Sequence, residues 1–406
     1  MTAYTTRTTC RSCGSAALDP VLSLGETPLA NALESPSDAT AAPRVPLDVV
    51  FCRDCTLVQI TEDVPPEVLF RDYVYFSSFS ETAVENARSI AERLIAERRL
   101  GSESLAMEIA SNDGYLLQHY RDRGVPVLGI EPARNIAAVA REKGIETIEE
   151  FFGSELAKTM ANRADVVHAN NVLAHVADLN GFVEGIAIVL KDGGTTSIEV
   201  PYARELIEKL EFDTIYHEHL CYFSVTALDA LFSRHGLTIH DVEGIPIHGG
   251  SLRVFAGRGA SRGESVVRLL EEERAWGVAS PETYARFGDR VRELCGALRA
   301  KLAELKAAGK SIAAYGASAK GTTLLSFAGI GSETLDFVAD RSTVKQGKLT
   351  PGTRIPIVAA EELMERMPDY VLLLVWNFAD EILRQQDEYG RRGGRFIVPI
   401  PAVTVV

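Results

Sequence analysis

Residues 105–117, LAMEIASNDGYLL, decide the predicted fold of the middle of this chain. Leu105–Ala110 is an apolar run of strand length, Leu116–Arg123 has helical spacing, and small polar residues lie between them. A strand, a tight turn and a helix start bring backbone N–H groups and the positive end of a helix to one point. The stretch therefore predicts a nucleotide-binding turn in an α/β domain.

The alternation of strands and helices continues from this stretch toward the C-terminus. Apolar runs are found at Val127–Glu131, Val166–Asn170 and Thr195–Val200, and helical patterns at Arg134–Lys143 and Gly181–Leu190. Strands that alternate with helices indicate βαβ units and a parallel, Rossmann-like sheet. Two further segments complete this part, an expected helix at Thr226–His235 and two expected strands within Thr238–Ala256.

A second α/β pattern follows a highly charged segment. Arg262–Ala308 has helical periodicity and one proline, which predicts two helices. The apolar runs after it are Ser311–Tyr315, Leu335–Ala339, Tyr370–Val375 and Arg395–Val398. We expect three domains: a zinc-binding domain at 1–68, a central Rossmann-like domain at 69–258 and a smaller Rossmann-like α/β domain at 259–406.

Length and charge exclude several classes of protein. The 406 residues exceed what one hydrophobic core usually holds, and the net charge is −14. An acidic chain repels phosphate backbones and anionic lipid, although a local basic pocket still allows a small anionic substrate. No apolar stretch has membrane-spanning length, and MTAYTTRTTC lacks the apolar core of a secretory signal. We expect a cytoplasmic monomer that binds neither nucleic acid nor membrane.

Four of the six cysteines form two pairs with the spacing CxxC. One tight turn presents both sulfurs of a pair to one ion, and two such turns complete a tetrahedron around Zn²⁺. A redox-active motif needs only one pair, and a reducing compartment disfavours two disulfides. The pattern therefore predicts structural zinc on Cys10, Cys13, Cys52 and Cys55, and buried thiols at Cys221 and Cys295.

The predicted turn departs from the dinucleotide pattern G-x-G-x-x-G, which lets the backbone approach a diphosphate. Ala110 and Asn112 fill the first two glycine positions, and Gly114 lies one residue short of the third. Glu131 ends the next strand, where a carboxylate accepts both hydroxyls of a ribose. With Glu108 in the strand, the set fits S-adenosylmethionine better, because that ligand has no diphosphate and carries a cationic sulfonium. A strand–helix turn without a ligand is the alternative.

Two asparagines end a later strand at the same expected edge of the sheet. Asn170 and Asn171 lie where switch-point geometry places ligand contacts, so we expect them beside the cofactor. The segments EIASNDGYLL, GIEPARNIAAVAREKGI, HANNVLAHV and LKDGG together resemble a class I methyltransferase. Members of that group often have glycine where Ala110 stands, so this position departs from the match.

The resemblance extends over the whole chain from Cys10 onward. With CxxC…PLAN…CxxC before these segments and the α/β block after them, the chain resembles the sugar C-methyltransferases of deoxysugar biosynthesis. The resemblance implies a zinc domain, a central cofactor domain and a C-terminal domain that helps to hold the substrate. It also implies the substrate, a nucleotide-linked 4-keto-deoxysugar with dTDP as the expected nucleotide. The methylated carbon lies α to the keto group, with C-3 and C-5 both open.

Residues 212–223, FDTIYHEHLCYF, concentrate titratable and aromatic side chains. Removal of a weakly acidic C–H proton needs a base near neutral pKa, and the enolate oxygen needs a hydrogen-bond donor. Metal ligation by HEH is the alternative, but residues two apart on a helix point in different directions. A polar turn on the surface, without a catalytic role, is a second alternative for this cluster.

The resemblance assigns individual roles in and near this cluster. It implies that His219 is the general base and that Glu218 orients the substrate or the base. It also implies a tyrosine in a Tyr-x-Ser-Ser context, here Tyr75, that polarises the keto oxygen or assists proton transfer, with Tyr73 close enough to confuse the assignment. Tyr222 is the weaker candidate for lining the sugar pocket.

Further substrate contacts are expected in two other segments. His248 precedes two glycines that allow close approach of a ligand, although a tight hairpin needs them equally. In the C-terminal domain, IAAYGASAKG (312–321) is another strand, turn and helix start, where Lys320 and backbone N–H groups can hold a diphosphate. Arg341 and Lys345 follow the next strand and add positive charge. A Rossmann-like domain that has lost its ligand is the alternative.

We therefore predict an S-adenosylmethionine-dependent C-methyltransferase of a nucleotide-linked keto sugar, with structural Zn²⁺. Two other classes stay open on the sequence alone. One is an NAD(P)-dependent oxidoreductase that uses either Rossmann-like domain. The other is a zinc-ribbon interaction protein with an inactive methyltransferase domain.

Overall fold

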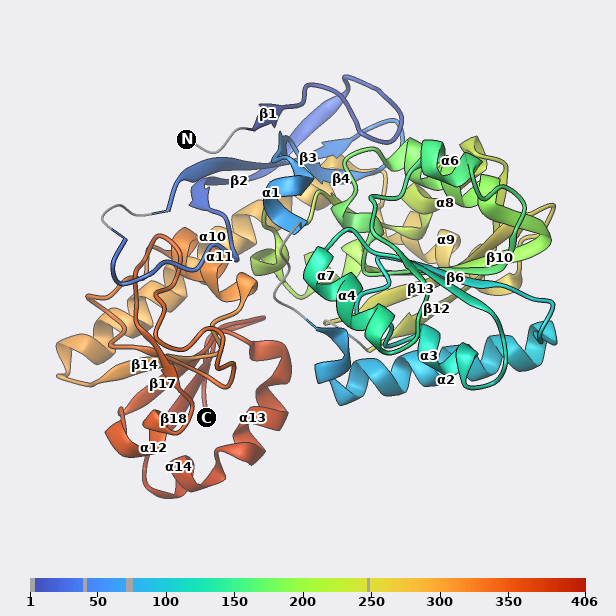
Figure 1. Cartoon of the computed structure of the whole chain (residues 1–406). Helices are drawn as coiled ribbons and strands as arrows, with labels where there is room; N and C mark the ends of the chain where they lie inside the picture. The colour runs from blue at the N-terminus through green and yellow to red at the C-terminus, as the bar shows by residue number, and fades with distance from the viewer. Residues whose placement is uncertain (1–3, 39–41, 71–75, 247–248) are drawn as a thin grey trace.

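The protein consists of three parts (Figure 1), and one long helix, α10 (Pro281–Ala307), contacts elements of each of them. The computed structural model describes residues 4–38, 42–70, 76–246 and 249–406. The N-terminal part lies at the top of Figure 1, the central α/β part at the right and the C-terminal part at the lower left. The central and C-terminal sheets are present as the sequence predicts, and the N-terminal part has a sheet of its own that the sequence did not predict. The expected boundaries after residues 68 and 258 stay a prediction.

The N-terminal part is built on a four-stranded sheet of order β11-β4-β3-β2. Its strands are β2 (Leu18–Pro28), β3 (Arg44–Cys52), β4 (Val58–Ile60) and β11 (Cys221–Tyr222). A second sheet pairs β1 (Thr5–Thr6) with β5 (Glu62–Asp63), and α1 (Pro66–Phe70) follows. Because β11 comes from the central part of the chain, the segment that contains His219 is tied directly to the zinc-binding domain.

The central part is a seven-stranded sheet of order β12-β13-β10-β9-β6-β7-β8. Its strands are β6 (Ala106–Ile109), β7 (Val127–Ile130), β8 (Thr147–Ile148), β9 (Ala164–Asn170), β10 (Leu190–Pro201), β12 (Leu237–Ile245) and β13 (Ser251–Arg258). The five strands β6 to β10 run parallel, and β13 runs antiparallel to both of its neighbours. The chain leaves β6 toward β7 and returns to β9 on the other side, so the switch point lies between β6 and β9.

Helices cover the central sheet, and the helices that the periodicity predicts at Leu116–Arg123, Arg134–Lys143, Gly181–Leu190 and Thr226–His235 are present among them. The helices of this part are α2 (Glu81–Arg98), α3 (Leu117–Arg121), α4 (Arg134–Glu142), α5 (Ser154–Lys158), α6 (Leu179–Val189), α7 (Ala203–Glu208) and α8 (Val225–Arg234). Short 3-10 turns are η1 (Ser77–Phe79), η2 (Leu173–His175) and η3 (Phe212–Thr214). The expected strands and helices of this part are confirmed.

The charged segment forms two helices, α9 (Glu264–Trp276) and α10 (Pro281–Ala307), as predicted. Helix α10 packs against the N-terminal sheet, where Tyr284 stacks on Phe51 with ring centroids 4.2 Å apart. Gly288 is needed there, since a Cβ at this position would lie 2.5 Å from the carbonyl oxygen of Val21. This helix therefore joins the first part of the chain to the last.

The C-terminal part is a six-stranded sheet of order β16-β15-β14-β17-β18-β19. Its strands are β14 (Ile312–Tyr315), β15 (Val338–Asp340), β16 (Ile357–Ala359), β17 (Tyr370–Leu373), β18 (Arg395–Val398) and β19 (Thr404–Val405). Its helices are α11 (Ala319–Ala328), α12 (Glu362–Arg366), α13 (Ala379–Gln385) and α14 (Asp387–Arg391), with η4 at Trp376–Phe378. The switch point lies between β14 and β17, so a second ligand crevice is expected where those two strands end.

Candidate functional site

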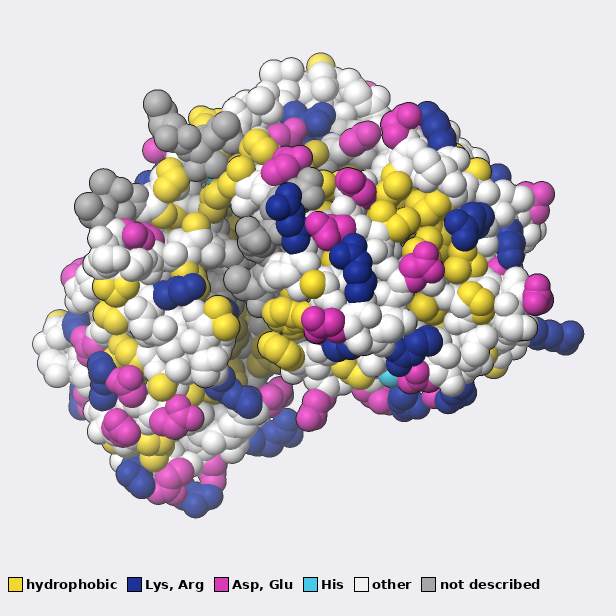
Figure 2. Space-filling model, viewed as in Figure 1, with side chains coloured by type: hydrophobic (Ala, Val, Ile, Leu, Met, Phe, Trp, Pro, Cys, Tyr) yellow, Lys and Arg dark blue, Asp and Glu magenta, His cyan; other side chains and the backbone are white. Residues whose placement is uncertain are grey.

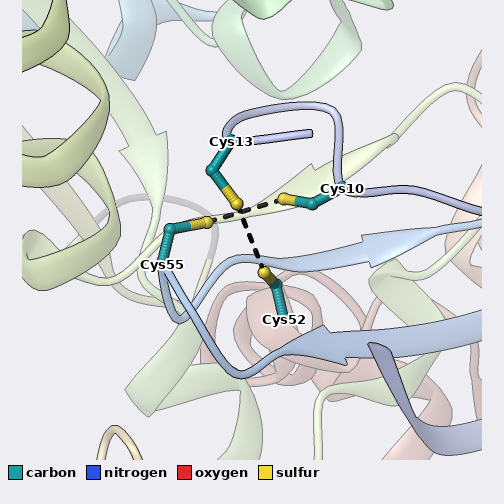
Figure 3. Close-up of side chains that lie close together, drawn as sticks. All are labelled: Cys10, Cys13, Cys52 and Cys55. Atoms are coloured by element: carbon teal, nitrogen blue, oxygen red, sulfur yellow. Dashed lines mark hydrogen bonds between the residues drawn. The ribbon is translucent and has the colours of Figure 1, made fainter. Parts of the chain in front are cut away.

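The two CxxC turns bring four sulfur atoms together in the N-terminal part (Figure 3). The Sγ atoms of Cys10 and Cys55 lie 3.5 Å apart, as do those of Cys13 and Cys52, and all four lie within 4.8 Å of one another. A disulfide would hold two sulfurs at about 2 Å, whereas four ligands at about 2.3 Å from one Zn²⁺ lie nearly 4 Å apart. The donor set fits a closed tetrahedral zinc site, as predicted.

Side chains of the central domain form hydrogen bonds with the first CxxC turn, Cys10–Cys13. The Asn180 side chain donates to the carbonyl oxygens of Arg11 and Ser12, at 3.1 and 3.0 Å. Arg234 donates to the Ser12 carbonyl at 2.9 Å, and His235 contacts Asn180 at 3.0 Å. The zinc turn is therefore part of the interface between the first two domains.

The predicted cofactor turn follows β6 and has the backbone geometry of a tight loop. Ala110, Asn112 and Gly114 all have positive φ, at 55°, 49° and 79°. A Cβ at residue 114 would lie 2.7 Å from Ile145 Cγ1, so glycine is required there. The Glu131 carboxylate accepts hydrogen bonds from the backbone N–H groups of Asn112 and Ala133, each at 2.9 Å. Glu131 thus ties the turn to the end of β7, and its expected contact with a ribose stays a prediction.

Buried carboxylates surround this turn. Burial raises the pKa of Glu108 well above its usual value, and the nearby Glu131, Asp113 and Glu199 add to the rise. Glu108 Oε2 is buried and has no hydrogen-bond partner among the residues that the structure describes. Such a set of acids favours a cationic group, and S-adenosylmethionine carries both a sulfonium and an ammonium.

The segment after residue 75 closes over the cofactor turn. The backbone N–H of Ser77 donates to Asn112 Oδ1 at 2.8 Å, and the Ser78 hydroxyl donates to Asp113. Lys143 Nζ lies 2.7 Å from the same Asp113 carboxylate. The predicted tyrosine Tyr75 and its neighbour Tyr73 lie outside the described residues, immediately before this contact.

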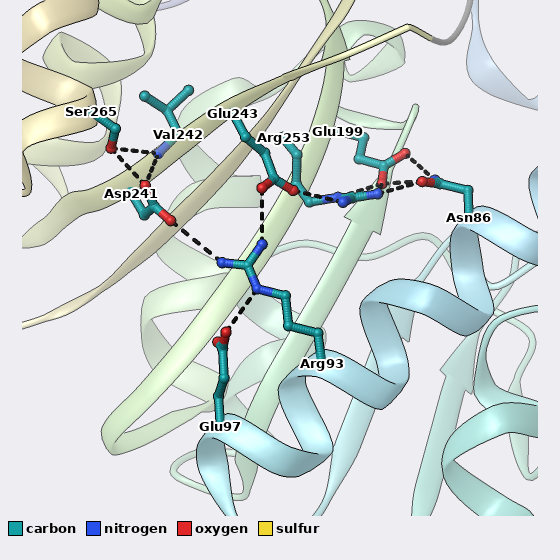
Figure 4. A network of polar contacts seen from close by, with 9 residues as sticks. All are labelled: Asn86, Arg93, Glu97, Glu199, Asp241, Val242, Glu243, Arg253 and Ser265. Atoms are coloured by element: carbon teal, nitrogen blue, oxygen red, sulfur yellow. Dashed lines mark hydrogen bonds and ion pairs between the residues drawn. The ribbon is translucent and has the colours of Figure 1, made fainter.

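Helix α2 continues this segment and is fixed to the sheet by a polar network (Figure 4). Arg253 donates to Glu199 at 2.9 Å, to Asn86 at 2.6 Å and to Glu243 at 2.7 Å. Arg93 also binds Glu243, at 2.9 Å. Because Arg253 and Glu199 are both buried, this network holds α2 in one position relative to the end of β10.

The two predicted asparagines lie at the end of β9, beside the switch point. Asn170 Oδ1 is buried and lacks a hydrogen-bond partner in the described part of the chain. Asn171 has a positive φ of 54°, and its N–H donates to the carbonyl of Glu199 at 2.8 Å. An unpaired amide oxygen at a strand end suits a ligand with N–H groups, so both positions stay candidates for the cofactor.

His219 is held in one tautomer by its surroundings. Its Nδ1 lies 2.7 Å from the carbonyl oxygen of Thr214, and its Nε2 lies 3.0 Å from the hydroxyl of Tyr216. A carbonyl oxygen only accepts, so Nδ1 carries the hydrogen and the Nε2 of the neutral ring has the lone pair. The nitrogen suited to accept a proton is therefore Nε2.

Glu218 points to a residue of the N-terminal part. Its Oε1 accepts a hydrogen bond of 2.7 Å from Asn31 Nδ2. Burial raises the pKa of the Glu218 carboxyl to about 7, and the Asn31 hydrogen bond opposes that rise. His217 does not join this pair, since its Nε2 contacts the carbonyl of Pro46 at 2.9 Å. The sequence contained Asn31 in the PLAN segment but offered no sign that it meets Glu218.

Two further side chains support His219. Tyr222 is buried, and its hydroxyl donates to the His219 carbonyl at 2.9 Å. This is a positioning contact, and the expected role of Tyr222 in the sugar pocket stays a prediction. His175 packs edge-on against the His219 ring, with centroids 4.7 Å apart. Burial lowers the pKa of His175 to about 4, so its ring is uncharged at neutral pH.

The turn after β14 repeats the arrangement of the cofactor turn. The Asp340 carboxylate accepts from the backbone N–H groups of Ala317 and Ser342, each at 2.7 Å. Lys345 Nζ donates to the Ala317 carbonyl at 2.8 Å, so this predicted residue does reach the turn. Arg341 follows Asp340 directly, and its side chain is exposed.

Lys320 lies on the other side of that turn and faces the central domain. Its Nζ is 4.4 Å from the centroid of the Trp376 ring and 3.5 Å from Asn377 Oδ1. Burial raises the pKa values of Glu211 and Asp213 to about 7 and about 6, and the positive charge of Lys320 opposes that rise. The ammonium group is thus directed toward the segment that leads to His219. His248, the remaining predicted substrate residue, lies outside the described residues.

A cavity of about 1060 Å³ lies between the central and C-terminal parts. Its lining includes Glu205, Glu211, Gly250, Trp376, Asn377 and Arg384. Figure 2 shows the notch between the two lobes and charges of both signs dispersed over this face. Among the described residues, no helix is both long and apolar enough to cross a membrane.

Comparison with known protein families matches three successive stretches of the chain. The matched descriptions are "Putative zinc binding domain" for residues 10–70, "Methyltransferase domain" for 82–242 and "C-methyltransferase C-terminal domain" for 246–401. The C-methyltransferase NovU of Streptomyces niveus is 40% identical over 404 residues, which cover 98% of this chain and 96% of NovU.

Solved structures match a smaller share of the chain. The PH0226 protein of Pyrococcus horikoshii OT3 is 15% identical, and the match covers 45% of this chain and 94% of that protein with a TM-score of 0.38. Magnesium protoporphyrin IX methyltransferase (ChlM) of Synechocystis PCC 6803 is 12% identical over 43% of this chain and 79% of its own, with a TM-score of 0.35.

Proposed function

Because this chain belongs to the C-methyltransferase family that includes NovU, we propose that it methylates a nucleotide-linked 4-keto-deoxysugar at a carbon next to the keto group. The protein is an S-adenosylmethionine-dependent C-methyltransferase with a zinc-binding domain. The sequence alone also allowed an oxidoreductase or an interaction protein with an inactive methyltransferase domain. Membership of this family favours the transferase. The sugar, its dTDP carrier, the cytoplasmic location and the residue roles below belong to the proposal.

The observation that carries the proposal is the hydrogen bonding of His219. The Thr214 carbonyl holds the Nδ1 hydrogen, so Nε2 is the proton acceptor. In the proposed reaction, Nε2 removes the proton α to the keto group, and the electrons of the broken C–H bond pass into an enolate. The Tyr216 hydroxyl must turn away from Nε2 to free its lone pair. In the proposed reaction, that hydroxyl would then donate to the substrate.

The remaining residues bind and orient. When bound, S-adenosylmethionine would supply an electrophilic methyl group to the enolate carbon, with S-adenosylhomocysteine as the leaving group. Glu131 and the Asn112 turn would hold its ribose, with Glu108 near its cationic end. Glu218 would accept a hydrogen bond from a sugar hydroxyl and so fix the ring relative to His219. Tyr75 keeps its proposed role at the keto oxygen.

The nucleotide would bind where the C-terminal part faces the central part. The turn after β14 offers backbone N–H groups at the start of α11, and Lys320 adds an ammonium group. Arg341 and Lys345 add positive charge on the other side of that turn. A substrate that extends from this turn toward His219 would span the interface between the two Rossmann-like domains.

Two assays test the proposal. The first offers a panel of dTDP- and UDP-linked 4-keto-6-deoxyhexoses with S-adenosylmethionine and detects the added methyl group by mass spectrometry. The second replaces S-adenosylmethionine by S-adenosylhomocysteine in D₂O and follows deuterium uptake at the carbon α to the keto group. We expect His219→Gln to slow this uptake about 10²- to 10⁴-fold.

Control variants separate chemistry from folding and from binding. His240→Gln changes a histidine of β12 that contacts Thr195 and should exchange like the wild type. Lys320→Met should raise KM for the nucleotide-linked sugar, whereas Lys310→Met, which breaks an exposed pair with Asp369, should not. Methylation of none of the keto sugars, or full exchange in His219→Gln, would overturn the proposal.

A further inference from the structure

Residues 29–34 of the N-terminal part lie where all three parts of the protein meet. The carbonyl of Ala30 accepts a hydrogen bond of 2.9 Å from the Thr322 hydroxyl of α11. The buried Glu34 accepts the backbone N–H of Gly352 at 2.7 Å and pairs with Arg354. Between these two anchors, Asn31 reaches Glu218 of the central part.

The anchors fix where the Asn31 side chain can reach. Ala30 and Glu34 are buried and bound to the C-terminal domain, whereas Asn31 itself is exposed. Its Nδ2 nevertheless lies 2.7 Å from Oε1 of Glu218, a side chain that is only 5% exposed. An exposed amide thus donates to a buried carboxyl, which it reaches from a segment held at both ends.

We infer that Asn31 is a positioning residue by which the zinc-binding domain keeps the Glu218 carboxyl ionised and aimed at the substrate. The inference rests on the proposed role of Glu218 in orienting the sugar. It assigns the N-terminal domain a direct part in the active site, in addition to its structural role.

The Asn31 hydrogen bond matters because few other interactions stabilise the ionised form of Glu218. Burial and the Asn31 hydrogen bond are the influences on its carboxyl within the described part of the chain, and no cation contributes. Its own turn carries the titratable residues Tyr216, His217 and His219, and His175 of η2 hydrogen-bonds with the Glu218 backbone. Burial lowers the pKa values of His217 and His175, so these rings supply no positive charge at neutral pH.

A hydrogen bond to a carboxylate stabilises the ionised form more than the protonated form. Removal of the Asn31 amide should therefore raise the pH at which Glu218 titrates by about one to two units. At neutral pH the carboxyl would then be largely protonated, and a protonated carboxyl has one oxygen fewer to accept a sugar hydroxyl. The wild-type Asn31 keeps a larger share of the Glu218 carboxyl in its ionised, accepting form around pH 7.

The test is a titration of the full-length, zinc-loaded enzyme without substrate. Protein labelled with ¹³C at the glutamate side-chain carboxyl is followed by NMR from acid to alkaline pH, and Glu218→Gln identifies the resonance. We expect Asn31→Leu to raise the midpoint by about one to two pH units, and Asn31→Gln, which keeps a donor, to recover part of the wild-type value.

A matched control removes the contact that holds Ala30, which is the neighbour of Asn31 in the same segment. Thr322→Val removes the hydrogen bond to Ala30 but leaves the Asn31 amide, so the Glu218 midpoint should stay within about 0.3 unit of wild type while thermal stability falls slightly. An unchanged midpoint in Asn31→Leu, or an equal rise in Thr322→Val, would overturn the inference.

Kinetics then separate this inference from the proposed function. With the keto sugar that the wild type methylates, the rising limb of kcat/KM against pH should move upward in Asn31→Leu by the same amount as the NMR midpoint. If that limb does not move, Asn31 does not act through Glu218 in turnover, and the inference fails. If the wild type methylates no keto sugar, the proposed function fails, and the titration still reports on the Asn31 contact.

Discussion

The indole Nε1 of Trp376 donates a hydrogen bond of 2.6 Å to Oδ2 of Asp213, which joins the C-terminal and central parts at a buried point. Asp213 begins the segment that carries His219, and Trp376 follows the strand next to the switch point of the C-terminal sheet. The pair fixes the distance between the proposed nucleotide site and the base. It also gives the buried Asp213 carboxylate a hydrogen-bond donor from another domain.

Trp376→Phe should destabilise the protein by about 1–3 kcal/mol at pH 8, because it leaves a buried carboxylate oxygen unpaired. Burial already raises the pKa of Asp213 to about 6 from the usual 3.8, so the ionised form is costly above pH 6. The destabilisation caused by Trp376→Phe should therefore be smaller at pH 5, where Asp213 is protonated. Urea denaturation at the two pH values measures it. Trp276→Phe, which changes a tryptophan packed edge-on against Tyr284, should show no such pH dependence.

Glu211→Gln should make the protein more stable at pH 8 by up to about 3 kcal/mol. Burial raises the pKa of Glu211 from 4.5 to about 7, so the folded wild type loses stability as the pH rises from about 4.5 to 7. The Glu211→Gln variant does not lose this stability, so the stability difference between it and the wild type should disappear near pH 4. Thermal denaturation across this range tests the sign. Glu208→Gln, at an exposed glutamate one turn earlier, should change stability by less than about 0.5 kcal/mol at every pH.

Cys55→Ser should release zinc and lower the free energy of unfolding by more than about 3 kcal/mol, because one of four thiolate ligands is lost. Methyl transfer should fall with it, since Asn180 and Arg234 of the central part bind the zinc turn directly. Metal content and thermal denaturation measure both effects. Cys295→Ser changes a buried thiol of α10 and should retain zinc; equal metal loss there would contradict the assignment of the ligands.

Glu131→Gln should weaken binding of S-adenosylhomocysteine about 10- to 100-fold in isothermal titration calorimetry. The substitution replaces one carboxylate oxygen by an NH₂ group that faces the backbone N–H of Asn112 or Ala133, so the turn itself is disturbed. Glu142→Gln, on the exposed side of α4, should bind like the wild type. Wild-type affinity in Glu131→Gln would show that the ribose is held elsewhere.

Some elements were missed because their local pattern is weak. Strands β2 and β3 form most of the N-terminal sheet, but Pro20, Gly25 and Pro28 interrupt β2 and make it resemble a loop. Register shifts accommodate these breaks, and no such shift is visible in a sequence. Strands β16 and β19 have three and two residues, too few for any periodicity to show.

The sequence by itself determined the features that depend on spacing within one short segment. These are the two CxxC turns, the strand–turn–helix at Glu108–Gly114, the position of Glu131 after the next strand and the alternation of the longer strands and helices in both α/β domains. Each is local because periodicity and turn chemistry act over a few residues.

Only the tertiary structure decided which distant residues meet. Asn31 and Glu218 are 187 positions apart, and Asp213 and Trp376 are 163 apart, yet each pair shares one short hydrogen bond. Their contact depends on how three domains pack around α10, and on β11 leaving the central part to join the zinc-domain sheet. The physical reason is that such pairing follows from the burial of whole surfaces, which no local pattern of residues records.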